Sequence, residues 1–564
     1  MKDKQTLLWL YHNSKTWLKS MLALTLGNAL FAGCGILFAL ACRSFIDGAA
    51  GGESTLLAKG LMVLAVLVSQ LVLRIVCGKL GVTLQGGLEM SFKTKLLGKL
   101  LHKDYAHAAR YHSGELMNRL TGDITVVSEG VATLLPDLVG LLTKLLCAIA
   151  VLYGLDRAFA LIFAIGGLLL FFTTKFLRGR LKHLHKTMQE KDGVVRSFMQ
   201  EVLESMIVIK TFGVEHEMEA KAAGLGRALC QAKLNKNNVS ILANSGLSFI
   251  FSLGYLYALV WSTFGLVAKT LSFGTLTAIL QLVGQVQAPF SGLSGLLPKV
   301  YGVIASAERL IELENLPDER EINHQAISVL ATYTNLHSLT LEDVSFGYDR
   351  EPVFDHVHLK IRKGDFVVVS GLSGIGKSTL FLLMLGVFSP SQGTICITLK
   401  KGEQIPIDRH TRKLFAYIPQ GHLLLSGTIR ENIAFVNPGA AEEEIMTAAQ
   451  VSCADEFIAK LPLGLDTVIG EKGQGLSEGQ MQRLAIARAV LSGAPIVLLD
   501  EATSALDEAT EETLLKNLKQ MTDKTCIIIS HKKAAFSVCN REIQIKNATI
   551  ITTERSYHHV CHSA

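Results

Sequence analysis

With 564 residues the chain is too long for one ordinary domain, and its length predicts two or three. Charged residues make up only 18% and the mean hydropathy is +0.35, which argues against a wholly soluble protein. The net charge of +6 gives no reason to expect a nucleic-acid partner, because Lys and Arg beside membrane spans account for it equally well.

The first 20 residues are basic and aromatic, with Trp9, Tyr11 and Trp17 among apolar neighbours. This composition predicts an amphipathic helix on the inner membrane surface and does not resemble a cleavable signal. Apolar runs then dominate as far as residue 310, whereas acidic and turn-forming residues dominate after it. A membrane half therefore precedes a soluble half, and membrane lipid is a predicted partner.

Six apolar segments approach the roughly 20 residues needed to cross a hydrocarbon core about 30 Å thick. They are residues 21–45, 57–77, 131–153, 157–177, 241–267 and 273–296. Pro289 and three glutamines interrupt the last segment, which makes it the weakest. Some of them could instead be buried core helices, but six in one half of the chain favour membrane spans.

The distribution of Lys and Arg predicts the orientation of the spans. Residues 47–54 contain neither residue type, whereas residues 78–130 and the stretch after Leu177 contain many. Cytoplasmic flanks collect positive charge, so both long connections and both termini are predicted to lie inside. Helical periodicity in these connections predicts that the spans continue well into the cytosol.

Ionisable residues are rare inside the predicted spans. Asp137 and Lys144 lie two helical turns apart in the third span. An intramembrane charge is often functional, but Asp137 could equally lie near an interface. The scarcity of charge suits a cavity for an apolar, amphipathic or bulky cargo.

A polar linker, residues 311–334, separates a membrane domain (1–310) from a soluble domain (335–564) in which strands and helices alternate. The buried strand Phe366–Ser370 leads into a glycine-rich loop and then an apolar helix, as a phosphate-binding loop requires. The residues predicted to bind ATP there are Gly371, Ser373, Gly374, Gly376, Lys377, Ser378 and Thr379. Lys377 would reach the β- and γ-phosphates as a catalytic group, and Ser378 would bind Mg²⁺.

A second buried strand, residues 496–500, ends in Asp500 and Glu501. Two acids after an apolar run could be a plain strand terminus, but the phosphate-binding loop favours a catalytic pair. Asp500 is then placed to hold Mg²⁺ through water, and Glu501 to orient or deprotonate the attacking water.

On these motifs the chain resembles the ABC transporters, in particular the exporter type, over nearly its whole length. The resemblance implies that Tyr348 stacks on adenine, that Gln420 contacts Mg²⁺, and that His531 contacts the γ-phosphate as a catalytic residue. It also implies that Ser477, Gly479 and Gln480 form a signature sequence that binds ATP across a dimer interface, with Asp507 in a crossing loop.

Three further segments resemble exporter motifs: residues 114–123 and 209–215 as coupling regions, and 467–473 as a short motif before the signature. Glu478 departs from the family, which usually has glycine there, so turnover could differ. The tail with His558, His559, Cys561 and His562 is either a metal-binding segment or, as its terminal position favours, a disordered end.

The predicted fold is an all-α six-span membrane domain with long cytosolic helical extensions, followed by an α/β P-loop ATPase domain. The resemblance implies ATP-driven export of a drug, lipid or peptide by a homodimer using alternating access. The alternatives are the competent half of a heterodimer and a nucleotide-gated regulator or channel. A bacterial inner membrane with a cytoplasmic ATPase domain is the predicted location.

Overall fold

The computed structural model of the chain describes residues 2–155, 157–319, 328–348, 351–421, 424–470, 473, 475–521 and 524–554. They form two compact units. The first combines Met1–Lys99 with Ser113–Asn315, and the second combines Leu100–His112 with Leu316–Ala564. Residues 100–112 lie in the first long connection of the membrane half, yet they pack with the soluble half. The domain boundaries given above stay a prediction.

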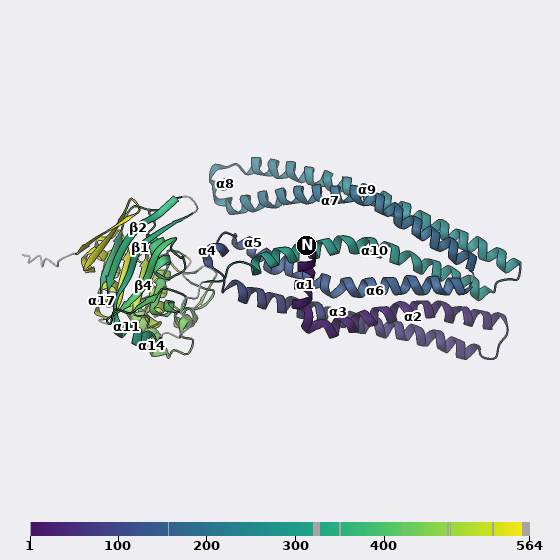
Figure 1. Cartoon of the computed structure of the whole chain (residues 1–564), viewed down its shortest axis with the longest axis horizontal. Coiled ribbons are helices and arrows are strands. Elements are labelled where there is room, and N and C mark those ends of the chain that lie inside the picture. Colours follow the sequence, from purple (N-terminus) through teal and green to yellow (C-terminus); the bar gives the residue numbers. More distant parts are fainter. Residues whose placement is uncertain are drawn as a thin grey trace, which may run out of the picture. The chain divides into compact units, whose positions relative to one another are not determined.

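The described residues of the first unit form helices and their connections. The helices are α1 (Lys2–Ser14), α2 (Leu18–Ala50), α3 (Leu56–Leu100), α5 (Ser113–Asn118), α6 (Ile124–Leu155), α7 (Arg157–Glu204), α8 (Met206–Phe212), α9 (Glu215–Val267) and α10 (Phe273–Glu314). A 3₁₀ turn, η1 (Lys15–Trp17), joins α1 to α2, and a π-helical segment, η2 (Arg119–Asp123), joins α5 to α6. Helices α2, α6 and α10 pack together, while α7 runs along α9 (Figure 1).

Among the residues whose side chains are described, four helical segments are long and apolar enough to cross a membrane. They are Lys4–Ala50, Leu56–Leu100, Ser113–Leu155 and Ser248–Val267, and Phe273–Val286 is a shorter apolar helix. The first three contain predicted spans, and the fourth covers most of 241–267. The predicted span 157–177 lies in α7, where the side chains of residues 158–178 are outside the described set.

The second unit contains two larger sheets and short helices. The strands are β1 (Leu336–Tyr348), β2 (Glu351–Arg362), β3 (Phe366–Ser370), β4 (Gln392–Leu399), β5 (Gln404–Pro406), β6 (Phe415–Ile418), β7 (Gly427–Thr428), β8 (Val468–Ile469), β9 (Ile496–Asp500), β10 (Thr525–Ile529), β11 (Arg541–Lys546) and β12 (Thr549–Glu554). The helices are α4 (Tyr105–Ala108), α11 (Val329–Asn335), α12 (Lys377–Met384), α13 (Ile429–Ile433), α14 (Glu442–Val451), α15 (Asp455–Ile458), α16 (Glu478–Leu491), α17 (Glu508–Gln520) and α18 (Lys533–Val538). The 3₁₀ turns are η3 (Thr411–Leu414), η4 (Ala434–Val436) and η5 (Gly464–Asp466).

The larger sheet has the strand order β12-β11-β3-β10-β9-β6 and is parallel from β11 to β6. Its central strands are buried on both faces, so alternate residues enter different cores. Val367 and Val369 of β3 join the core that also contains α12, whereas Val368 joins the core that contains α17. Continuous apolar runs such as Phe366–Ser370 are typical of parallel strands covered on both sides.

The register of the parallel strands aligns their carboxyl ends. Ile529 of β10 pairs with Val369 of β3 on one side and with Asp500 of β9 on the other. Ile418 of β6 pairs in turn with Leu499 of β9. The segments that follow these four strands therefore begin at one edge of the sheet, where parallel α/β sheets bind ligands.

In the first unit, the carboxylate of Asp47 near the end of α2 caps the start of α10. The hydroxyl of Ser272 donates to Asp47 Oδ2 over 2.9 Å, and the Gly274 N–H donates to Oδ1 over 2.8 Å. A helix N-terminus favours negative charge, because its first N–H groups have no partner within the helix. Asp47 thus fixes the entry of α10 against α2.

Replacing Asp47 with Ala should destabilise the first unit by about 1.5–3 kcal/mol, because hydrogen bonds to a charged acceptor are lost. Thermal unfolding of the detergent-purified chain would measure the loss. Glu53→Ala is the matched control: Glu53 contacts Lys59 and Thr55 in an exposed loop, and its removal should change stability by less than about 0.5 kcal/mol. Equal shifts in the two variants would contradict this account.

Candidate functional site

A cavity of about 1050 Å³ opens beside the loop that follows β3. Its lining includes four residues that the sequence predicts to bind nucleotide: Tyr348, Gly374, Gly376 and Thr379. The Tyr348 hydroxyl lies 3.1 Å from the Thr379 hydroxyl, while 49% of the tyrosine remains exposed. An anchored aromatic ring with an open face is suited to stacking on a base.

The loop between β3 and α12 adopts a conformation that requires glycine. Gly376 precedes the first residue of α12 with φ of +105°. A Cβ atom there would come within 2.3 Å of the Val353 side chain. The backbone can therefore turn its N–H groups toward a phosphate at the start of α12, where the helix dipole favours negative charge.

Lys377 is buried, and its ammonium group donates to the carbonyl oxygens of Gly371 and Leu372, each over 3.0 Å. The side chain thus folds back over its own loop. Carbonyl oxygens compensate the buried charge only partly, so a phosphate oxygen in the same space would be a stronger partner.

Asp500 at the end of β9 is buried and accepts hydrogen bonds from Ser378 and from Tyr417, whose hydroxyl lies 3.2 Å away. Burial raises the pKa of Asp500, although both hydrogen bonds oppose the rise. Burial and the neighbouring Asp500 also raise the pKa of Tyr417. A carboxylate beside a hydroxyl supplies the hard oxygen atoms that Mg²⁺ prefers, so these residues fit that ion.

Glu501 has a backbone conformation that is rare outside glycine, with φ of +51°. Its N–H donates to the carbonyl of Ile529 over 3.1 Å, and its carboxylate accepts a 2.8 Å hydrogen bond from the Gln420 side chain. Such conformations persist where surrounding contacts enforce them, and they concentrate at functional sites. The sheet edge therefore brings the predicted glutamine and the predicted catalytic acid into contact.

The predicted signature residues begin helix α16. Ser477 is the N-cap, and its side chain and that of Gln480 form a reciprocal capping box. Gly479 lies against the segment after β9, because a Cβ atom there would come within 2.9 Å of the Ala505 carbonyl. Glu478, the departure from the family pattern, is exposed in the first turn, where its negative charge suits the helix N-terminus.

His531 follows β10 and is exposed, two residues beyond the level at which β10 pairs with Asp500. Asp507 is the N-cap of α17, and the hydrogen bond from the Thr510 N–H lowers the pKa of Asp507. Ser373 is also exposed on the phosphate-binding loop. The functional roles of all these residues stay predictions.

The sequence did not identify part of the cavity lining. Glu351, Pro352 and Val353 come from the start of β2, and Asn547 and Ala548 form the two-residue turn between β11 and β12. Both turn residues have positive φ, as a type I′ hairpin requires. The Asn-Ala pair between two segments of alternating apolar and polar residues could have indicated the turn. No sequence pattern near it indicated that the turn lies beside the cavity.

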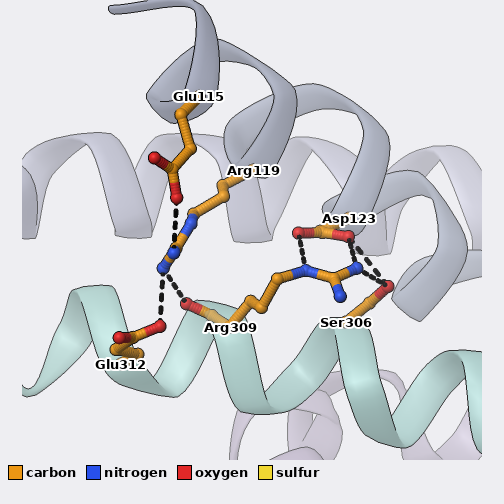
Figure 2. A network of polar contacts seen from close by, with 6 residues as sticks. All are labelled: Glu115, Arg119, Asp123, Ser306, Arg309 and Glu312. Carbon is orange, nitrogen blue, oxygen red and sulfur yellow. Dashed lines mark hydrogen bonds and ion pairs between the residues drawn. The ribbon is translucent and has the colours of Figure 1, made fainter. Parts of the chain in front are cut away.

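The first predicted coupling region, residues 114–123, is tied to α10 by a polar network (Figure 2). Asp123 is buried and accepts from Ser306 Oγ over 2.9 Å and from Arg309 Nε over 2.8 Å. Arg119, also buried, donates to Glu115 and Glu312 over 2.7 and 2.9 Å. The π-helical segment η2 begins at Arg119 and ends at Asp123, and both side chains contact α10.

The second predicted coupling region lies in α8 and the turn after it. Ile207 and Phe212 of α8 are 78% and 75% exposed. Large apolar side chains with this much exposure are suited to a contact with another surface. The short motif at 467–473 is only partly described, since residues 471 and 472 fall outside the described set, as does the His- and Cys-containing tail.

Comparisons with known proteins match both parts of the chain. The model of the ABC transporter family matches residues 354–504, and that of the ABC transporter transmembrane region matches residues 17–290. An ATM1-type heavy metal exporter of Novosphingobium aromaticivorans is 31% identical over 76% of this chain and 72% of its own length. An ATP-dependent lipid A-core flippase of Legionella pneumophila is 30% identical over 78% and 74%.

The solved structure of a bacterial Atm1-family ABC exporter with ATP bound matches with a TM-score of 0.80. The match covers 95% of this chain and 94% of that one at 24% identity. This likeness concerns the fold: a helical transmembrane region followed by a nucleotide-binding domain that contains sheets.

Removing Arg309 should destabilise the first unit, because the buried carboxylate of Asp123 would lose its charged partner. We expect Arg309→Gln to cost about 2 kcal/mol, less than the 3–5 kcal/mol of a fully buried pair because Arg309 is half exposed. Denaturant unfolding in detergent would measure it. The double variant Asp123→Asn/Arg309→Gln should recover at least half of the loss.

Lys299→Gln is the matched control, since Lys299 faces Glu129 at 3.4 Å in an exposed pair. It should change stability by less than about 1 kcal/mol. Asp123→Asn is measured as well. If the double variant loses as much free energy of unfolding as the two single variants together, Asp123 and Arg309 are not coupled.

Proposed function

This chain belongs to the ABC transporter family, and we propose that two copies of it form an exporter of an amphipathic or hydrophobic molecule. ATP hydrolysis coupled to transport is the activity of the chain, and export is the direction. The dimer, the class of substrate and the residue roles below are the proposal. The single observation that carries it is the gathering of the four strand ends at one sheet edge.

At that edge the residues suit phosphate binding and hydrolysis. Lys377 and the N–H groups at the start of α12 would hold the phosphates, and Ser378 and Asp500 would hold Mg²⁺, which neutralises charge on the phosphates. Glu501 would accept a proton from the attacking water, and Gln420 orients its carboxylate. His531, which follows the neighbouring strand β10, would contact the γ-phosphate.

A second copy is proposed because the predicted contacts of the signature with phosphate lie elsewhere on the domain. Ser477 and Glu478 lie at the start of α16 and are exposed. Ser477 and Gln480 hydrogen-bond to each other, and Gly479 lies against Ala505. If Ser477 and Gly479 bind the ATP held by another copy, the phosphate oxygens gain their full set of hydrogen-bond donors only when two copies meet. ATP would then favour the closed pair, and its hydrolysis products would favour the open one.

The helical unit would convert this closure into alternating access. We propose six spans per copy, of which four are supported by length and composition among the described side chains. The exposed apolar side chains of α8 would dock on the ATPase domain of the partner. Asp123 and Arg309 would make the first coupling region move with α10, because they join η2 to that helix.

The relatives supply two classes of cargo, since their names describe lipid A-core and heavy metals. Few charged side chains lie in the predicted spans, which favours an amphipathic or apolar cargo for this chain. The bacterial relatives favour an inner membrane location, with the ATPase domain in the cytoplasm.

Two alternatives remain distinct from this proposal. A heterodimer would pair this chain with a related half whose own site is degenerate, and the intact set from Lys377 to His531 favours the homodimer. A nucleotide-gated channel would hydrolyse little ATP, which the Gln420–Glu501 arrangement disfavours.

The decisive experiment is Mg²⁺-dependent ATP hydrolysis by the purified chain, reconstituted alone in lipid vesicles. The wild type should be active, and Glu501→Gln should lower kcat at least about 100-fold, because the amide is a far weaker proton acceptor. Glu512→Gln, an exposed carboxylate of α17 paired with Lys516, should retain wild-type activity.

An inactive wild type that is folded and embedded in the membrane would contradict the homodimer and indicate a heterodimeric partner. Activity of Glu501→Gln equal to that of the wild type would remove Glu501 from the mechanism. Stimulation of the wild-type rate by a lipid or drug would then identify the class of cargo.

A further inference from the structure

The segment Ser504–Asp507, here called the crossing loop, lies between β9 and α17 and directly precedes α17. Side chains from two different elements hold it within the same copy. One is Lys532, which follows His531 after β10, and the other is Gln482 on the helix that begins with the signature.

The ammonium group of Lys532 lies at the centre of the first anchor. It donates to the carbonyl of Thr503 over 2.8 Å and to the carbonyl of Leu506 over 2.7 Å. It therefore bridges the backbone just before the crossing loop and the backbone within it. An ammonium group has three donors, and these two bonds fix its position.

A buried carboxylate provides the third partner of Lys532. Glu511 Oε2 lies 3.4 Å from the ammonium nitrogen, and Glu511 is only 1% exposed. Its other oxygen, Oε1, accepts a 2.8 Å hydrogen bond from the Thr503 hydroxyl. A buried carboxylate without a cation is costly, so Glu511 favours the position in which Lys532 reaches the loop.

The second anchor is the side-chain amide of Gln482, which is also buried. Its nitrogen donates to the Ser504 hydroxyl over 3.0 Å, and its oxygen accepts from the Ala505 N–H over 3.1 Å. The second turn of the signature helix, the crossing loop and the segment after β10 are thus joined by hydrogen bonds.

We propose that Lys532 is a positioning residue for ATP hydrolysis, and that Lys532 and Gln482 make the crossing loop, the start of α16 and His531 move as one body when two copies close. Neither side chain touches the nucleotide in this account. The inference rests on the proposed dimer, because these three segments face an ATP site shared by two copies.

The test separates positioning from stability. Lys532→Met alone leaves Glu511 buried without its cation, so it should lower the unfolding temperature. The double variant Lys532→Met/Glu511→Gln removes the unpaired charge and should regain most of the lost stability. It still lacks the donor to Thr503 and Leu506, so kcat should fall about tenfold while KM for MgATP stays within about twofold of the wild-type value.

Lys532→Arg should retain a kcat close to that of the wild type, since a guanidinium keeps the positive charge and several hydrogen-bond donors. Lys533→Met, which changes the neighbouring exposed lysine, should behave as the wild type. All variants are assayed as full-length chains in lipid vesicles, and equilibrium binding of a fluorescent ATP analogue reports nucleotide affinity independently of turnover.

A folded double variant with wild-type kcat would overturn the inference. A double variant that loses ATPase activity only because it binds the nucleotide more weakly would also overturn it. If the double variant does not fold, Gln482→Met provides the second test, because it removes the other anchor and should show the same fall in kcat without a change in KM. An inactive wild type would instead contradict the proposed homodimer, so the two failures are distinguishable.

Discussion

The register of four parallel strands is the constraint on which the site depends. Because Ile529 of β10 pairs with both Val369 and Asp500, strands β3, β10 and β9 end at the same level. The phosphate-binding loop, the acidic pair and His531 must then emerge side by side. A shift of β10 by one residue would exchange Ile528 and Ile529 between the two cores, so burial on both faces fixes the register and, through it, the site.

Sequence patterns predicted those parts of the chain that depend on local chemistry. An apolar strand, a glycine-rich loop and a helix start indicated the phosphate site, and Asp500 and Glu501 stood out because they follow a buried run. The apolar segments indicated a helical membrane half for the same reason, since length and hydropathy are local properties. The family resemblance supplied Tyr348 and Gln420, which isolated sequence patterns could not have indicated.

Features that depend on contacts distant in sequence were not predicted. Arg309 lies 186 residues from Asp123, and Lys532 reaches a loop 26 residues away, so no periodicity links either pair. The turn at Asn547 and Ala548 reaches the cavity only because β11 lies next to β3. Residues 100–112 pack with the soluble unit although they continue from a predicted span, because Ala106 contacts the apolar core around α12.

Some parts of the site are held by hydrogen bonds within one copy, and other parts are exposed to solvent. Gln420, Glu501 and the crossing loop are held by hydrogen bonds within one copy, whereas Ser477 and His531 are exposed and Tyr348 is half exposed. A site that is already ordered spends little free energy on reorganisation when its ligand arrives. If these parts of the site are already ordered in each copy, the free energy of the interaction between ATP and a second copy is available to close the pair. If the loops had to be ordered first, part of this binding free energy would offset their loss of entropy. Less would then be available to move the helices that transport the cargo.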